Sequence, residues 1–219
     1  MQTTWRHAPR QSRSAATERR LVVAATRLLA RRGYERLAIS EVARAARTSV
    51  GGLYARFADK QALLHAIDED LMQRLRTLVD TTMAPGRLRR ADVAAVIRAS
   101  VAMMVRMFAR ERPLLREISL RARQSGDLAF TARVRAFNDH AHGLLTERLL
   151  QRRAAIHHPR PEEAIAFGVL MVSAAAREVV LFGDPPLSPG TLRGRRLIHE
   201  LTTAYCAYLD AHPPQEPSR

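Results

Sequence analysis

The residues best suited to chemistry lie in one short stretch of this sequence. Between positions 47 and 60 the chain carries two hydroxyl side chains, two adjacent glycines, a tyrosine and the chain's single lysine. Such hydroxyl and ammonium groups donate hydrogen bonds to phosphate, and glycines let a backbone approach base edges closely. The stretch therefore indicates contact with DNA rather than a reaction. The residues expected to make that contact are Arg47, Thr48, Ser49, Val50, Gly51, Gly52, Tyr54 and Lys60.

Each of these groups has its own expected role. Ser49 stands where a helix needs an N-cap, because its hydroxyl can accept a hydrogen bond from a free backbone amide. Thr48 and Val50 are expected to read base edges. Tyr54 and Lys60 are expected to bind phosphate and so to set the register on the duplex. Two glycines in a helix cost about 1 kcal/mol each relative to alanine, which favours a close-approach role over a plain loop with two glycines.

These residues need two short helices to position them. The pattern predicts helices at about 40–46 and 50–57, separated by a tight turn, which is the arrangement of a helix-turn-helix unit. A preceding helix should begin near residue 16 or 17 and end at Gly33, a residue suited to a left-handed C-terminal cap. The side chains expected to fix the crossing of the two short helices are Val42, Ala45, Leu53 and Phe57.

The rest of the chain also has helical periodicity and almost no strand signal, so the predicted fold class is all-α. The longest uncharged apolar run, Ala164–Ala176, has 13 residues, fewer than the roughly 18 that span a bilayer. We therefore expect a buried helix there and no membrane partner. The predicted helices after the first three are at about 60–82, 91–109, 113–124, 128–153, 161–182 and 191–211.

Charge and composition narrow the function classes. The net charge is +15, and residues 1–60 hold 13 basic and 4 acidic groups, which is the electrostatic footprint of a protein that binds a polyanion. The alternative is a general bias toward arginine, since 35 of the 36 basic residues are arginine. The single cysteine, Cys206, and the lack of an apolar signal segment favour the cytoplasm. No catalytic, metal-site or cofactor motif is found, so no enzyme activity, metal or cofactor is expected.

Residues 17–64 resemble the DNA-binding region of the TetR/AcrR family of bacterial transcriptional regulators. The resemblance is carried by the run Ser-Val-Gly-Gly-Leu-Tyr-Ala-Arg-Phe-x-x-Lys-x-x-Leu from Ser49, by Gly33-Tyr34 and by Glu41-Val42-Ala43. The sequence departs from the family pattern at two positions. Arg47 stands where the family usually has glycine, and Val50 where a basic or polar residue is frequent.

The resemblance implies a three-helix DNA-binding domain followed by a larger helical domain that binds an effector and forms a homodimer. The expected division is a flexible basic arm at 1–16, the DNA-binding domain at 17–64, the effector and dimerisation domain at 65–212, and a disordered tail at 213–219. It further implies a ligand-responsive regulator, most often a repressor, on an inverted-repeat operator of double-stranded DNA. The alternative is a helical small-molecule-binding protein that has lost specific DNA binding.

Methionine and phenylalanine side chains suit an adaptable cavity for an apolar or amphipathic effector. At helical spacing such residues belong to a core more often than to a pocket. The candidates for effector contact are Met103, Met107, Phe108, Phe130, Phe137, Phe167 and Met171.

Overall fold

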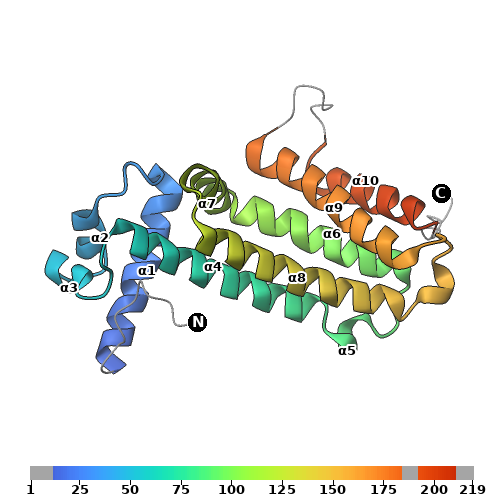
Figure 1. The fold of residues 1–219 in the computed structure, drawn as a ribbon, viewed down its shortest axis with the longest axis horizontal. Coiled ribbons are helices and arrows are strands. Elements are labelled where there is room, and N and C mark those ends of the chain that lie inside the picture. The colour runs from blue at the N-terminus through green and yellow to red at the C-terminus, as the bar shows by residue number, and fades with distance from the viewer. Residues whose placement is uncertain (1–11, 184–191, 211–219) are drawn as a thin grey trace. The chain divides into compact units, whose positions relative to one another are not determined.

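The computed structural model describes residues 12–183 and 192–210, and these residues are mostly helical with no β-strand. Figure 1 shows the helices in chain order. The all-α fold class is confirmed. The helices are α1 (Ser12–Arg32), α2 (Ile39–Ala45), α3 (Val50–Tyr54), α4 (Lys60–Thr82), α5 (Pro85–Leu88), α6 (Val93–Arg110), α7 (Arg112–Ser125), α8 (Leu128–Leu150), a 3-10 turn η1 (Arg153–Ala155), α9 (Pro161–Arg177), a π-helical turn η2 (Glu178–Phe182) and α10 (Gly194–Tyr208).

Side-chain caps explain where several of these helices begin. The Asp59 carboxylate accepts a hydrogen bond from the Ala62 amide at 2.7 Å, which caps α4. Asp92 caps α6 in the same way through the Ala95 amide, also at 2.7 Å. At the other end of α1, Gly33 has a φ of +77° and takes the left-handed conformation expected of it.

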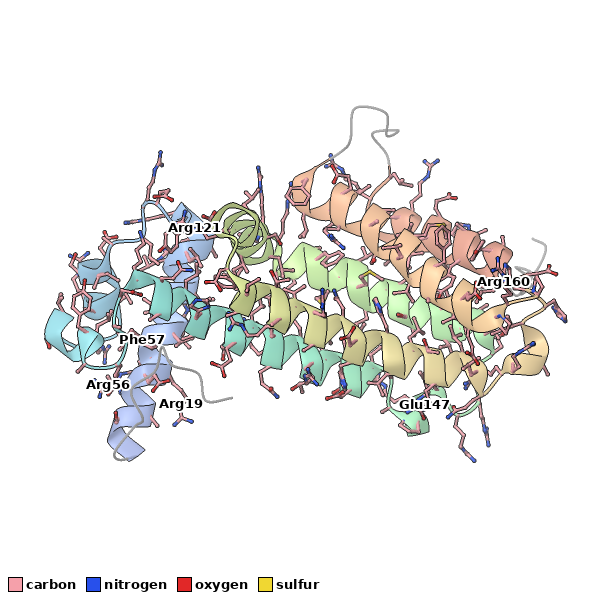
Figure 2. The ribbon with its side chains drawn as sticks, viewed as in Figure 1. Arg19, Arg56, Phe57, Arg121, Glu147 and Arg160 are labelled. Atoms are coloured by element: carbon pink, nitrogen blue, oxygen red, sulfur yellow. The ribbon has the colours of Figure 1, made fainter. Side chains whose placement is uncertain are left out.

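Several helices are a few residues shorter than expected, namely α3, α8 and α10, and three further differences concern α1, α5 and η2. First, α1 begins at Ser12, inside the segment expected to be a flexible arm, and its first turns are held by Arg56, which donates to the Ser14 hydroxyl at 3.3 Å (Figure 2). Second, Pro85 begins the short helix α5 instead of only ending α4, because proline suits the first position of a helix. Third, the last turn of the helix expected at 161–182 is π-helical. The expected tail at 213–219 lies outside the described residues.

Contacts divide the chain into two compact units. The N-terminal unit comprises the chain up to Arg74 together with Pro113–Val134, and the C-terminal unit comprises Leu75–Arg112 and the chain from Arg135 onward. This division differs from the expected boundary at residue 64, because α7 and the first turns of α8 pack with the three N-terminal helices. Both α4 and α8 continue from one unit into the other.

The core of the C-terminal unit includes α6, α9 and α10, which contact one another. Gly168 lies where α9 meets α10: a Cβ atom there would come within 1.9 Å of the Tyr205 ring, so only glycine allows this approach. The buried Tyr205 hydroxyl donates to the Ile165 carbonyl oxygen at 2.6 Å. The opposite face of α9 is exposed, with Phe167 at 51% and Leu170 at 59%.

Within the described residues, one helical segment, 161–182, is long and apolar enough to cross a membrane by length and composition, with a mean hydropathy of 1.9. A core helix of a soluble protein meets the same criterion. In this segment 33% of the apolar window is buried, and α9 packs against α6 and α10.

Candidate nucleic-acid interface

The predicted helix-turn-helix unit is formed by α2, α3 and the turn between them. Val42, Leu53 and Phe57 are fully buried, as their expected role requires. Ala45 was expected to point inward as well, but it is exposed, and Ala46 is buried in its place. The reason is helical geometry, because the buried face of α2 is formed by Val42, Ala43 and Ala46, and Ala45 lies two positions after Ala43, on the other side of the helix.

The N-cap of α3 is formed as predicted. Ser49 has an extended backbone, and its hydroxyl accepts a hydrogen bond from the Gly52 amide at 2.9 Å. This bond satisfies one of the amide groups that a helix leaves free at its start. The first turn of α3 is therefore fixed before any ligand binds.

Arg47 lies in the turn with a φ of +54°. This is the left-handed region that L residues with a side chain occupy at a cost of about 1–2 kcal/mol. The turn thus requires the conformation that glycine provides, although the chain has an arginine there. Its side chain is exposed.

The two glycines of α3 have different surroundings. A Cβ atom at Gly52 would lie 2.6 Å from the Thr48 hydroxyl and 3.2 Å from the Ser49 hydroxyl, so this glycine makes room for the N-cap. At Gly51 the nearest atom would be 3.9 Å away, and the residue is exposed. Internal packing therefore explains why residue 52 is a glycine. For Gly51, close approach to a ligand remains the explanation.

The remaining predicted contact residues of α3 and its turn lie at the surface of the N-terminal unit. Val50 is 41% exposed and Tyr54 is 47% exposed, whereas Leu53 between them is fully buried. Ser49 is exposed and Thr48 is half-buried. In this unit α3 therefore presents one face to its own core and the opposite face outward.

Lys60 has partners within the N-terminal unit that the sequence did not indicate. Its Nζ lies 4.3 Å from the centroid of the Tyr34 ring and donates to the Glu35 carbonyl oxygen at 3.4 Å. The same ring is contacted by the Arg121 guanidinium at 3.9 Å. From α7, Glu117 accepts a hydrogen bond from the Tyr34 amide at 2.8 Å. Tyr34 thus fixes the half-exposed lysine and joins the start of α4 to α7.

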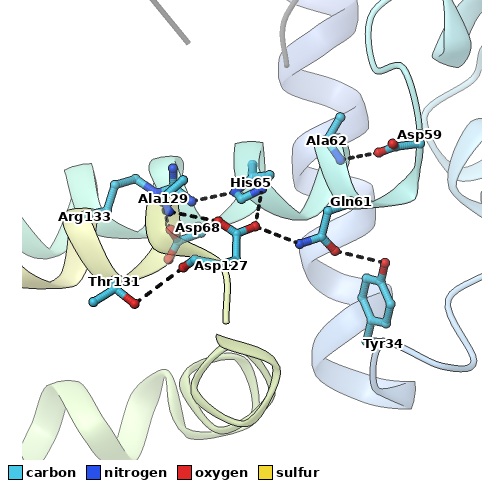
Figure 3. Close-up of polar contacts among 10 residues, drawn as sticks. All are labelled: Tyr34, Asp59, Gln61, Ala62, His65, Asp68, Asp127, Ala129, Thr131 and Arg133. Atoms are coloured by element: carbon cyan, nitrogen blue, oxygen red, sulfur yellow. Dashed lines mark hydrogen bonds and ion pairs between the residues drawn. The ribbon is translucent and has the colours of Figure 1, made fainter. Parts of the chain in front are cut away.

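A buried polar cluster continues from Tyr34 along α4 (Figure 3). The Tyr34 hydroxyl donates to Gln61 at 3.3 Å, and the Gln61 amide donates to Asp127 at 3.3 Å. Asp127 lies 3.0 Å from Nε2 of His65. Arg133 contacts the other ring nitrogen of His65 at 2.8 Å. These contacts hold the start of α8 against α4.

Arg133 also forms an ion pair with Asp68, whose side chain is completely buried. Oδ1 of Asp68 has no hydrogen-bond partner among the described residues. Burial raises the pKa of the Asp68 carboxyl despite the neighbouring guanidinium. Burial likewise lowers the pKa of His65. Sequence analysis missed this cluster, although an aspartate on the apolar stripe of α4 with Leu64 and Leu71 is a signal that could have indicated it.

The candidate effector residues are not brought together. Met103 and Met107 line a cleft of about 470 Å³ in the C-terminal unit. Phe130 belongs to the N-terminal unit and stacks on His65 with a centroid distance of 4.4 Å. Phe167 is exposed and lies 5.2 Å from the Tyr208 ring. Phe108, Phe137 and Met171 are half-buried and do not line the cleft. No group of metal-ligating side chains occurs in the described part of the chain.

The helices α2 and α3 form a helix-turn-helix unit with an exposed, capped second helix, and comparison with known proteins identifies the domain to which this unit belongs. Residues 21–67 match the model of the bacterial regulatory proteins of the tetR family. The A-factor receptor protein of Streptomyces griseus is 43% identical over 61 residues, which are 28% of this chain and 22% of that protein. The chain therefore spans about a fifth of the length of this curated relative.

Solved structures extend the similarity of fold to nearly the whole chain. A putative TetR-family transcriptional regulator from Mesorhizobium loti has a TM-score of 0.67 at 17% identity, covering 91% of this chain and 96% of its own. A transcriptional regulator from Rhodococcus sp. Rha1 has a TM-score of 0.67 at 20% identity, covering 88% and 96%. The family match therefore covers residues 21–67, and the solved structures show that nearly the whole chain has the fold of these regulators.

Proposed function

We propose that this protein is a cytoplasmic, ligand-responsive repressor that binds an inverted-repeat operator as a homodimer. The proposal rests on one observation, the preformed structure of α3 and the exposure of its outer side chains. Its N-cap is formed, its inner side chain Leu53 is fully buried, and the outward residues Val50 and Tyr54 are exposed. A preformed helix with an outward polar and apolar face is what major-groove recognition requires.

The basic excess of residues 1–60 supports the same partner. Positive groups concentrated in one part of a chain attract a duplex and supply sequence-independent affinity. In this proposal Arg47, Tyr54 and Lys60 bind phosphate, while Thr48 and Val50 touch base edges. Because Lys60 is fixed over the Tyr34 ring, its ammonium needs little reorganisation when it meets a phosphate.

The proposed homodimer rests on the exposed apolar face of α9. Large apolar side chains at 51% and 59% exposure on one helix mark an interaction surface more often than a solvated one. Tyr208 of α10 extends this face beside Phe167. A twofold dimer would present two copies of α3, which matches an operator with inverted half-sites.

The test compares binding to the protein's own promoter region with binding to random DNA of equal length, at about 50 and 200 mM salt. Lys60→Ala and Tyr54→Phe should weaken binding to both DNAs, whereas Thr48→Ala and Val50→Ala should chiefly reduce the preference for the promoter. Tyr34→Phe retains the ring under Lys60 and serves as the matched control. Equal behaviour of the two variant pairs would refute the assigned roles. Loss of any promoter preference in the native protein would favour the alternative of a small-molecule-binding protein without specific DNA binding.

A further inference from the structure

The C-terminal unit contains a cleft of about 470 Å³ formed by α4, α5 and α6. This volume is within the range of small-molecule sites, about 300–1,000 Å³. The lining residues are of two kinds, apolar or small side chains and arginines. They are Leu78, Thr82, Arg87, Leu88, Ala99, Ala102, Met103, Arg106, Met107 and Arg110.

The charges of the cleft are all of one sign. Arg106 and Arg110 are four residues apart on α6, so both lie on the same helix face. Arg106 forms no ion pair with any residue that the structure describes, and Arg110 has only a long contact of 3.6 Å with its neighbour Glu111. No carboxylate lines the cleft. Two like charges in this position repel each other mildly, and an anion between them would remove that cost.

The apolar part of the cleft is elongated. From Ala99 to Met107 the apolar lining follows α6 for nine residues, which corresponds to about 12 Å. Met103 lies in the middle of this length, and a methionine side chain adapts to ligands of different shape. A long apolar body can therefore lie along α6 with its polar end at the two arginines.

We propose that this cleft binds an elongated organic anion, with its apolar body on Met103 and Met107 and its carboxylate at Arg106 and Arg110. Arginine is suited to this role because its guanidinium presents two parallel N–H donors to a carboxylate. That such an anion is the effector of a DNA-binding regulator rests on the proposed function. As a binding site, the cleft can be tested without DNA.

The position of the cleft in the chain gives such a ligand a route to regulation. Leu78 is four residues after the point where α4 leaves the N-terminal unit, and Arg110 is two residues before the point where the chain returns to it. A ligand that contacts both helices constrains both of these connections. It can change DNA affinity only if it prefers one arrangement of the connections over the other.

Isothermal titration of the full-length protein with decanoate, below its micellar concentration, tests the site. Acetate and 1-decanol supply the charge and the apolar chain separately, and both should bind at least tenfold more weakly than decanoate. Arg106→Gln should weaken decanoate binding at least tenfold, and Met103→Glu should abolish it. Arg98→Gln, an exposed arginine of α6 outside the cleft, is the matched control and should stay within twofold. Circular dichroism checks that each variant is folded.

The proposal is overturned if decanoate does not bind, if 1-decanol binds equally well, or if Arg106→Gln binds like the native protein. It is also overturned if only phosphatidylglycerol vesicles, and not free decanoate, are bound through Arg106. Operator binding is measured separately. If decanoate binds at the cleft and leaves operator affinity unchanged, the site stands and its role as effector site fails. If the protein binds no DNA, the proposed function fails and the cleft is unaffected.

Discussion

At the residue scale, Arg47 combines a left-handed backbone with an exposed side chain. Its φ of +54° lies in the left-handed region, which glycine adopts without a steric penalty and which strains an arginine. The chain could remove this strain with one substitution. A contact between the exposed guanidinium and a DNA phosphate explains why an arginine would be useful at this position.

We expect Arg47→Gly to change stability and DNA binding in opposite directions. Relief of the left-handed strain, less the greater freedom of glycine in the unfolded chain, should raise the free energy of unfolding by about 0.5–1 kcal/mol. Loss of one phosphate contact should weaken binding to all DNA and reduce the slope of log K against log salt by about 0.9. Urea unfolding and anisotropy titrations measure the two effects. Arg47→Asn, which tolerates this backbone, is the control for charge alone. Unchanged DNA affinity in both variants would exclude the phosphate contact.

At the scale of elements, α4 combines two tasks. Its first residue, Lys60, lies against Tyr34, which follows α1, and its second and third turns carry His65 and Asp68 against the start of α8. Buried charges are expensive unless they are paired. This cluster therefore holds α8 in one register on α4, because sliding by one residue would leave Asp68 without Arg133.

The cluster predicts a pH dependence of stability. His65 faces Asp127 and Arg133 and has Asp59 nearby, and burial lowers its pKa below the usual 6.5. The unfolded chain therefore binds the His65 proton more readily, so the free energy of unfolding should fall as the pH decreases below about 6.5. The raised pKa of Asp68 has the opposite sign, since its protonation favours the folded state.

Replacing His65 measures how much this residue contributes to the pH dependence of the unfolding free energy. His65→Gln should flatten the slope of the unfolding free energy just below pH 6.5, as measured by urea unfolding at a series of pH values. His199→Gln, at an exposed position of α10, should keep the native slope. An identical slope in the native protein and in His65→Gln would show that His65 does not contribute.

At the scale of the whole molecule, the proposed dimer interface is the exposed face of α9. Phe167→Glu should place a charge inside the proposed dimer interface and shift the protein from dimer to monomer in analytical ultracentrifugation. Operator affinity should fall with it, because two half-sites would no longer be bound together. Leu128→Glu, at an 81% exposed position of α8, is the control and should remain dimeric. A stable dimer of Phe167→Glu would place the interface elsewhere.

The sequence by itself determined the all-helical fold, the bounds of α4, the cap at Ser49 and the helix-turn-helix unit. These features depend on interactions between residues a few positions apart, such as the bond from Gly52 to Ser49 or the periodic burial of Val42, Leu53 and Phe57. Local patterns of that kind are written directly in the residue order.

The tertiary structure alone decided which distant residues meet. It stacked Phe130 on His65, put Lys60 over Tyr34, and grouped α7 with the N-terminal helices. It also separated the roles of the two glycines of α3. These pairings join positions that are mostly tens of residues apart in the chain. Helical periodicity fixes only which face of a helix is buried, and the partner of that face depends on how all the helices pack together.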